Sequence, residues 1–251
     1  MINLIMSKEW KNVSFVGDLS FGPRGQFQSI PNVLNPDGTD DPSSFNIQNL
    51  YVSYAVNDVL SFDMGYMGTF MGYEVISPVD NFNYSTSYLF TYGPFQNAGL
   101  KINVAPSDKV DFMVGLFNDV NSYSNTPGSS FDLGAQVHVA PTEGLDVYVN
   151  YLTSETGFDE LDLTAGYQAT DALYLGLNVA KQWASAGKAY FDNDSQNGFF
   201  GAALYVQYAL SDAFGLGLRA EHFNESTNNN TNAIAPSIDD TSVNSFTLLG
   251  N

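Results

Sequence analysis

Residues 133–151 read LGAQVHVAPTEGLDVYVNY, two runs of alternating apolar and polar side chains joined by a short break. Apolar residues occupy the odd positions from Leu133 to Val139, and again from Leu145 to Tyr151. A period of two is typical of a β-strand with two different faces, whereas a helix would lose this phase within four residues. The break contains Pro, Thr, Glu and Gly, which are turn-forming residues. The stretch therefore predicts a β-hairpin.

The break recurs as one pattern: an apolar residue, two variable positions, a small polar residue, usually an acid, a spacer and a second apolar residue. Clear copies lie at 54–60, 104–110, 139–145, 167–173 and 208–214, with a weaker copy at 4–10. Longer segments rich in Asn, Ser, Asp, Gly and Pro join the other ends of the alternating stretches, at about 22–44, 68–95, 118–130, 153–159, 184–197 and 224–241. Short turns at one end and long loops at the other are typical of an outer-membrane β-barrel.

The alternation predicts about twelve strands of about 9–11 residues, a length that crosses a bilayer at a tilt. We expect an all-β fold, an up-and-down antiparallel transmembrane β-barrel, with residues 1–251 as a single barrel domain. A soluble β protein is the alternative, but it would cover its polar face with Lys, Glu and Thr. Here that face carries Gly, Asn, Gln, Asp and Tyr with almost no Lys, as expected for a water-filled lumen, and Tyr, Phe and Trp gather near the strand ends as interfacial anchors.

The composition excludes several classes of function. The net charge of −19, from 27 acids and 8 bases, argues against sequence-independent nucleic-acid binding, which needs Lys and Arg. The chain has no Cys and two His, so it offers neither a disulfide framework nor a thiolate metal site. It has no apolar run of about 18 residues that could form a transmembrane helix. Residues 1–6 do not form a secretory leader, although an outer-membrane protein requires one.

Segment 68–95, GTFMGYEVISPVDNFNYSTSYLFTYGPF, differs from the other long connections. It holds eight aromatic residues, two acids and no base. A free surface loop would not expose so many aromatic rings. We expect the segment either to pack against the barrel wall or a partner protein, or to fold into the lumen and narrow it, as inward loops do in barrels of this kind.

Eleven residues are candidates for lining or constricting a pore, because they lie in the inward phase of a strand or in segment 68–95. They are Asp63, Tyr73, Glu74, Asp80, Lys101, Asp111, His138, Asp146, Asp162, Arg219 and Glu221. Acids outnumber bases, and because carboxylates lining a pore favour cations, we expect a weak cation preference. Lys101 is the most isolated inward base. Arg219 and Glu221 lie two apart on one face and can pair with each other, which would remove both from the selectivity argument.

Catalysis finds little support in the sequence. His138 is in the inward phase with no Ser placed beside it, and Asp146 and Asp162 are a pair of acids that any acidic barrel would contain by chance. No phosphate-binding loop, dinucleotide fingerprint or metal-ligand spacing is present. We therefore expect neither an enzyme nor a cofactor.

The run from Asp63 to Ile102 resembles the signature of the OmpL-like β-barrel porins. In that family a Gly-aromatic-Gly strand ending leads into Gly-Tyr-Glu, then an Asn, aromatic and Tyr-Ser stretch, then Gly-Pro-Phe. The matching positions here are Gly72-Tyr73-Glu74, Asn81, Tyr84-Ser85, Ser87-Tyr88 and Gly93-Pro94-Phe95. The later run 218–223, LRAEHF, resembles the family's Leu-Arg-x-Glu-aromatic strand.

This resemblance implies an integral porin of the bacterial outer membrane and says little about the solute. The family is expected to continue beyond the strand at 242–249, into further strands that end with an aromatic residue. We therefore expect the 251 residues to be part of a larger barrel, without its leader and its C-terminal strands.

A passive diffusion channel for small hydrophilic solutes or ions is the function that this sequence favours. Two alternatives remain: a closed barrel with a structural or adhesion role, and a transporter of apolar molecules that uses segment 68–95 as a cradle. The expected partners are the outer-membrane bilayer and the solutes. Nothing in the sequence identifies a subunit interface, although porins are often trimers.

Overall fold

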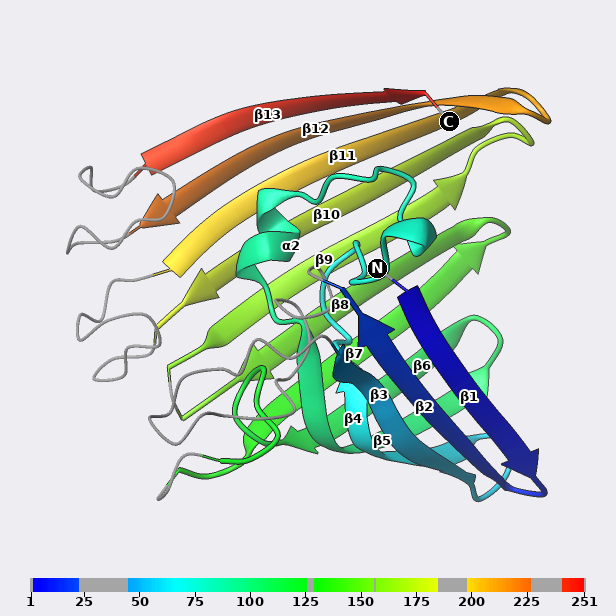
Figure 1. Ribbon diagram of the computed structural model, residues 1–251, viewed down its shortest axis with the longest axis vertical. Helices are drawn as coiled ribbons and strands as arrows, with labels where there is room; N and C mark the ends of the chain where they lie inside the picture. Colours follow the sequence, from blue (N-terminus) through cyan, green and yellow to red (C-terminus); the bar gives the residue numbers. More distant parts are fainter. Residues whose placement is uncertain are drawn as a thin grey trace.

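The computed structural model describes residues 2–22, 45–125, 129–155, 157–184, 198–226 and 241–250. They form one antiparallel sheet of thirteen strands, in which strands adjacent in sequence are adjacent in space (Figure 1). The strands are β1 (Ile2–Trp10), β2 (Val13–Phe21), β3 (Phe45–Ala55), β4 (Leu60–Gly68), β5 (Gln96–Ser107), β6 (Val110–Phe117), β7 (Asp132–Thr142), β8 (Leu145–Thr153), β9 (Asp159–Gln168), β10 (Leu173–Trp183), β11 (Gly198–Ser211), β12 (Phe214–Ser226) and β13 (Thr241–Gly250). This confirms the all-β, up-and-down antiparallel fold. The predicted loops 22–44, 184–197 and 224–241 lie largely outside the described residues.

The five clear copies of the turn pattern each connect two consecutive strands, as predicted. In the copies at 104–110 and 139–145 the register shifts just before the turn, and Pro106 or Pro141 lies in the shifted part. Proline has no N–H to donate to the ladder, so a β-bulge is where a strand tolerates it. The acid and its spacer then form the tip of the turn, which is why this pattern repeats.

The weaker copy at 4–10 is not a turn, and this expectation was wrong. It is part of the strand β1, which pairs along its whole length with β2, from Ile2 opposite Phe21 to Trp10 opposite Val13. The turn lies after it, where Lys11 has a φ of 53°. A two-residue hairpin needs positive φ, and Lys11 supplies it without Gly or Asn. The missed strand raises the count from about twelve to thirteen.

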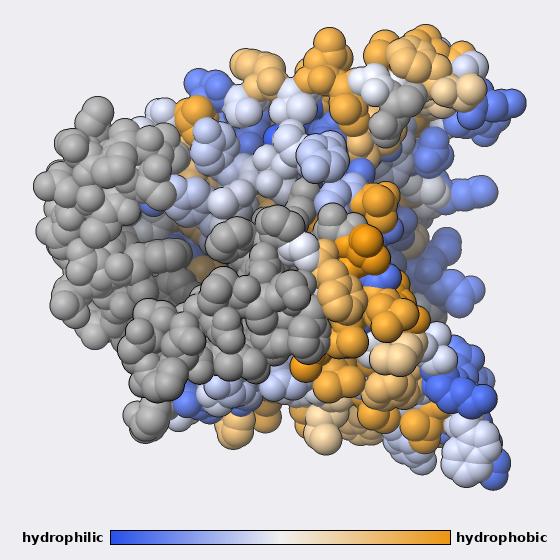
Figure 2. Space-filling view, in the orientation of Figure 1, coloured by the Kyte–Doolittle hydropathy of each residue, from blue (hydrophilic) through white to orange (hydrophobic). Residues whose placement is uncertain are grey.

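The exposure of the two faces is the reverse of that in a soluble protein. On the outer face, apolar side chains are open, with Leu204 58% and Val114 50% exposed. On the inner face, Asn150 and Asp162 are each only 1% exposed. Figure 2 shows hydrophobic side chains gathered over β1 and β2, and hydrophilic ones along the edge where the short turns lie. An apolar exterior around buried polar groups is the arrangement that a bilayer requires.

The inner face is not uniformly polar, contrary to the expectation of a wet surface throughout. Two apolar clusters lie on it toward the long-loop ends of the strands. The first contains Met67, Met71, Met113, Phe117, Val120, Leu152 and Phe158. The second contains Leu89, Ala180, Phe199, Ala203, Tyr205 and Phe223. Met71 and Leu89 come from segment 68–95, so the clusters form where this segment covers the wall.

The sheet curves strongly but is open in the described part of the chain, since β1 and β13 are at opposite ends of the strand order and do not pair. Besides the strands, the structure contains the 3-10 turn η1 (Pro78–Asp80) and the short helix α2 (Tyr88–Tyr92), both within segment 68–95. Of the helices among the described residues, none has the length and apolarity to span a membrane.

Candidate functional site

Segment 68–95, here called the inner segment, lies against the concave face of the curved sheet, with η1 and α2 over the wall (Figure 1). Its two ends meet where the Thr69 N–H donates to the Phe95 carbonyl at 3.0 Å. The segment therefore leaves and rejoins the sheet at one place, between β4 and β5. Between these two residues, the segment is bound by side chains of strands far away in the sequence.

One deeply buried contact is the ion pair between Glu74 and Arg219 of β12. The Arg219 Nη1 lies 2.7 Å from the Glu74 Oε1, and the two side chains are only 3% and 4% exposed. The other Glu74 oxygen accepts from the Ser87 N–H at 2.7 Å and from its hydroxyl at 3.0 Å. The Tyr205 hydroxyl donates to Oε1 at 3.3 Å. Buried charges need such partners, because desolvation otherwise costs several kcal/mol.

Arg219 and Glu221 both bind the backbone of the inner segment rather than each other. The guanidinium donates to the Ser85 carbonyl at 2.6 Å and to the Thr86 carbonyl at 2.8 Å. Glu221 accepts from the N–H groups of Tyr88 and Leu89 at 3.0 and 2.9 Å. These two N–H groups begin α2 and have no acceptor within the helix, so the carboxylate caps it. The pairing of Arg219 with Glu221 that the sequence allowed is therefore not formed.

A third anchor is Asp162 of β9, near the start of the inner segment. Its carboxylate accepts from the Gly72 N–H at 3.0 Å, from Asn150 at 2.6 Å and from Asn178 at 2.5 Å. Beside it, the Gln136 amide donates to the Phe70 carbonyl at 3.0 Å. Side chains of β7, β8, β9 and β10 thus act together on two residues of the segment.

Glycines on the inner face make room for the rings of the segment. A Cβ on Gly176 would lie 2.3 Å from the Tyr73 hydroxyl, and a Cβ on Gly217 would lie 2.1 Å from the Phe82 ring. Both distances are far below van der Waals contact, so any side chain there would displace the aromatic residue. These glycines of β10 and β12 therefore leave space for the aromatic rings of the segment on the inner face.

The remaining predicted residues form two groups on the inner face outside the segment. The Lys101 Nζ lies 3.6 Å from the Asp63 carboxylate, so Lys101 is not the isolated base that the sequence suggested. His138 lies between two carboxylates, with Nδ1 2.6 Å from Asp111 and Nε2 2.9 Å from Asp146. Its ring stacks on Tyr148 at 4.2 Å. Asp111 and Asp146 stay accessible, with side chains 39% and 53% exposed.

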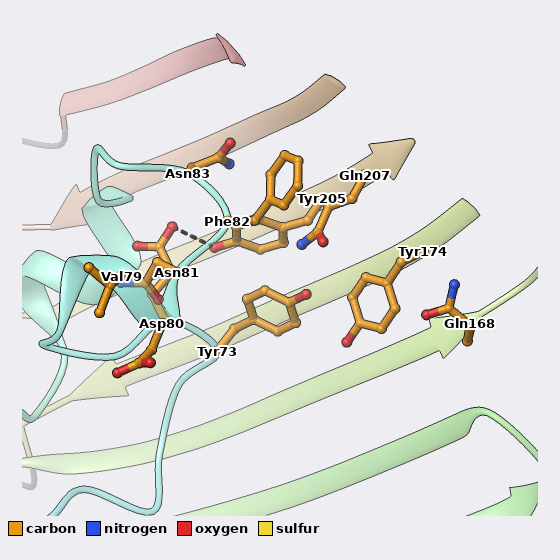
Figure 3. Close-up of a pocket in the computed structure, with 11 residues that line it drawn as sticks. Tyr73, Val79, Asp80, Asn81, Phe82, Asn83, Gln168, Tyr174, Tyr205 and Gln207 are labelled. Atoms are coloured by element: carbon orange, nitrogen blue, oxygen red, sulfur yellow. Dashed lines mark hydrogen bonds between the residues drawn. The ribbon is translucent and has the colours of Figure 1, made fainter. Parts of the chain in front are cut away.

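A cavity of about 580 Å³ lies between the inner segment and the wall (Figure 3). Its lining residues are Tyr73, Glu74, Val79, Asp80, Asn81, Phe82, Asn83, Gln168, Tyr174, Tyr205 and Gln207. The ring of Tyr73 stacks on that of Tyr205 at 4.2 Å. Burial, followed by the hydrogen bond with Tyr174, raises the pKa of the Tyr73 phenol, so this group remains a donor. Asp80 is exposed on η1.

Sequence reasoning named Tyr73, Glu74 and Asp80 from this cavity but missed its wall. Tyr174, Tyr205 and Gln207 all lie in the inward phase of their strands, so the alternation could have identified them. None of the three is charged, so a choice of inward strand residues by charge does not include them. Among the described residues, no group of three or more His, Asp or Glu side chains is arranged to hold a metal ion.

Comparison with known families and structures agrees with this architecture. The family model described as "Putative beta-barrel porin-2, OmpL-like" matches residues 1–251. No curated protein sequence matches the chain significantly.

Among solved structures, the outer-membrane channel DcaP of Acinetobacter baumannii is similar in fold, with a TM-score of 0.59 and 13% identity over 89% of this chain and 66% of that one. OccK8 (OprE) of Pseudomonas aeruginosa gives a TM-score of 0.51 and 10% identity over 93% of this chain and 60% of that one. The chain thus spans less than two thirds of the length of either channel. At these identities the likeness concerns the fold.

The Arg219→Met variant should destabilise the protein and release the inner segment. It leaves the Glu74 carboxylate buried without its cation, which costs about 3–5 kcal/mol. Urea unfolding in lipid vesicles measures the loss, and limited proteolysis reports the release of residues 68–95.

Lys101→Met is the matched control, because its ion pair is longer and less buried, and it should cost only about 1 kcal/mol. Glu74→Gln combined with Arg219→Met should recover part of the stability. Equal losses for the two Met variants would contradict the anchoring role of Arg219.

Proposed function

The chain belongs to the OmpL-like β-barrel porin family of the bacterial outer membrane, and we propose that it forms a passive diffusion channel for small hydrophilic solutes or ions. We also propose that residues 1–251 act as one barrel unit in which the inner segment narrows the pathway, and that the pathway weakly prefers cations. Transport rather than catalysis is the role that a porin family and a channel fold favour.

One observation supports the constriction: side chains of three strands bind the inner segment directly, and side chains of two more strands support them. Glu74 binds Arg219 on β12, Gly72 binds Asp162 on β9, and Phe70 binds Gln136 on β7. Asn150 of β8 and Asn178 of β10 support Asp162 from either side. A segment held in this way occupies cross-section that would otherwise be open to solutes.

The accessible charges support the weak cation preference. Lys101 and Arg219 are each neutralised by a carboxylate. A histidine donates from both ring nitrogens only as imidazolium, so His138 with Asp111 and Asp146 carries one net negative charge in that form. An acidic group on the lining of a narrow pathway attracts cations.

A hydrophilic solute fits better than an apolar one, because the wall already occupies much of the segment's aromatic surface. Phe70 stacks on Phe117 at 5.7 Å, and Tyr88 stacks on Phe223 at the same distance. The ring faces stacked against the wall are not open to an apolar molecule. For this reason a channel for hydrophilic solutes is favoured over a transporter of apolar molecules.

Removing the inner segment should increase the single-channel conductance. Because Thr69 and Phe95 already hydrogen-bond, Phe70–Pro94 can be replaced by an Asn-Gly turn without moving β4 or β5. We expect the conductance in a planar bilayer to rise by about twofold or more. Unchanged conductance of the folded deletion variant would mean that the segment does not narrow the pathway.

The ion selectivity should depend on the His138 group. In a KCl gradient, Asp111→Asn combined with Asp146→Asn should move the reversal potential toward zero, because the accessible carboxylates are lost. Asp58→Asn is the control, since this exposed acid lies in a short turn between β3 and β4. A reversal potential that stays unchanged in the double variant would rule out this group as the source of selectivity.

A further inference from the structure

We propose that the cavity between the inner segment and strands β9–β11 binds a neutral, polyhydroxylated solute of mono- or disaccharide size. This inference rests on the proposed channel function, because it assigns a solute to the pathway. The volume of about 580 Å³ is within the range of about 300–1,000 Å³ of small-molecule sites. The wall side of the cavity, with Gln168, Tyr174 and Gln207, lies near the short-turn ends of its strands.

Polar groups of the amide type line this cavity from both sides. The Asn83 side chain is 5% exposed, and its Oδ1 has no hydrogen-bond partner. This oxygen is closed off beside Gly217, so Asn83 borders the cavity without offering its Oδ1 to a ligand. Gln207 contributes a second amide from β11, opposite the segment (Figure 3). Amides offer both donors and acceptors, which is the set that vicinal hydroxyl groups require.

Aromatic rings supply flat apolar surfaces next to these amides. In Figure 3 the Tyr174 ring of β10 lies beside the Tyr73 ring, and the Phe82 ring of the segment lies beyond the Tyr205 ring. The Tyr73 hydroxyl lies against Gly176 and the Phe82 ring lies against Gly217. The wall therefore fixes the positions of both side chains. A sugar ring combines apolar C–H faces with hydroxyls around its edge. Rigid aromatic faces bordered by amides match both features.

The lining of the cavity does not suit an anion, a cation or an apolar molecule. The described lining residues include no Lys, Arg or His, so an anion would find no basic group. The Glu74 carboxylate is already bound by Arg219 and Ser87, which leaves Asp80, exposed on η1, as the carboxylate available to a cation. An apolar molecule would displace water from the amides and phenols without replacing the hydrogen bonds that water makes with them. A neutral polyol satisfies these groups and requires no counter-charge.

Calorimetric titration of the folded protein in detergent micelles with maltose tests the site directly. The unmodified protein should bind maltose, and Gln207→Leu and Tyr174→Phe should each weaken binding by about tenfold. The first substitution removes the amide and the second only a hydroxyl, so at least one variant should keep the native fold. Asn103→Leu is the matched control: this inner-face amide lies on β5, outside the cavity, and its loss should leave the maltose affinity unchanged.

Failure of this inference can be told apart from failure of the channel. No heat of binding with maltose or glucose, or unchanged affinity in both folded cavity variants, would overturn the sugar site whatever the conductance. Preferred binding of choline or gluconate would overturn it too, by assigning a cation or an anion to the cavity. Bilayer conductance is measured separately, so a protein that conducts but binds no sugar loses the site and keeps the proposed function.

Discussion

Hydrocarbon offers no hydrogen bonds, and this constraint determines the rest of the structure. Apolar side chains such as Leu204 and Val114 face outward, so each strand must place its polar side chains on the inner face. Those groups then need partners within the protein. The inner segment provides many of them through its backbone, including the carbonyls of Ser85 and Thr86 for Arg219. The position of the segment and the composition of the inner face therefore explain each other.

Two groups of charged residues on the inner face differ in their burial. Glu74, Arg219, Asp162 and Glu221 are buried and hold the segment in place. Asp111 and Asp146 are accessible to solvent, and the proposed cation preference rests on them. A count of charges in the sequence treats both groups alike. The structure separates them by burial, and the cation preference is proposed for the accessible group alone.

Much of the fold was predictable because a strand encodes its faces locally. A period of two residues and a repeated turn pattern were enough for twelve strands and for the outer face. The strand β1 was missed because the turn after it uses Lys11 at positive φ, where Gly or Asn is usual. Apolar residues in the inward phase, such as Met113 and Phe117, were also visible, but their meaning depended on the segment that covers them.

The contacts of the segment could not be predicted in the same way. Glu74 and Arg219 are 145 residues apart, and Leu89 and Glu221 are 132 apart, so their pairing depends on how the sheet curves and where the segment lies. The phase of a strand says that a side chain points inward, but not which group it meets there. Partner choice is therefore a property of the tertiary structure. Lys101 and Asp63 differ, because they lie opposite each other on the paired strands β4 and β5, so the register of these strands sets their pair.

A disulfide across the segment and the wall tests the central claim most directly, because the chain contains no cysteine of its own. A Cβ on Gly201 would lie 2.7 Å from the Leu89 Cγ, so cysteines at positions 89 and 201 are close enough to bond. In the folded protein we expect Leu89→Cys with Gly201→Cys to cross-link on mild oxidation. Leu89→Cys with Ala202→Cys, whose second cysteine faces outward, should not. A folded protein in which the first pair stays reduced would contradict the docking of the segment on the inner face.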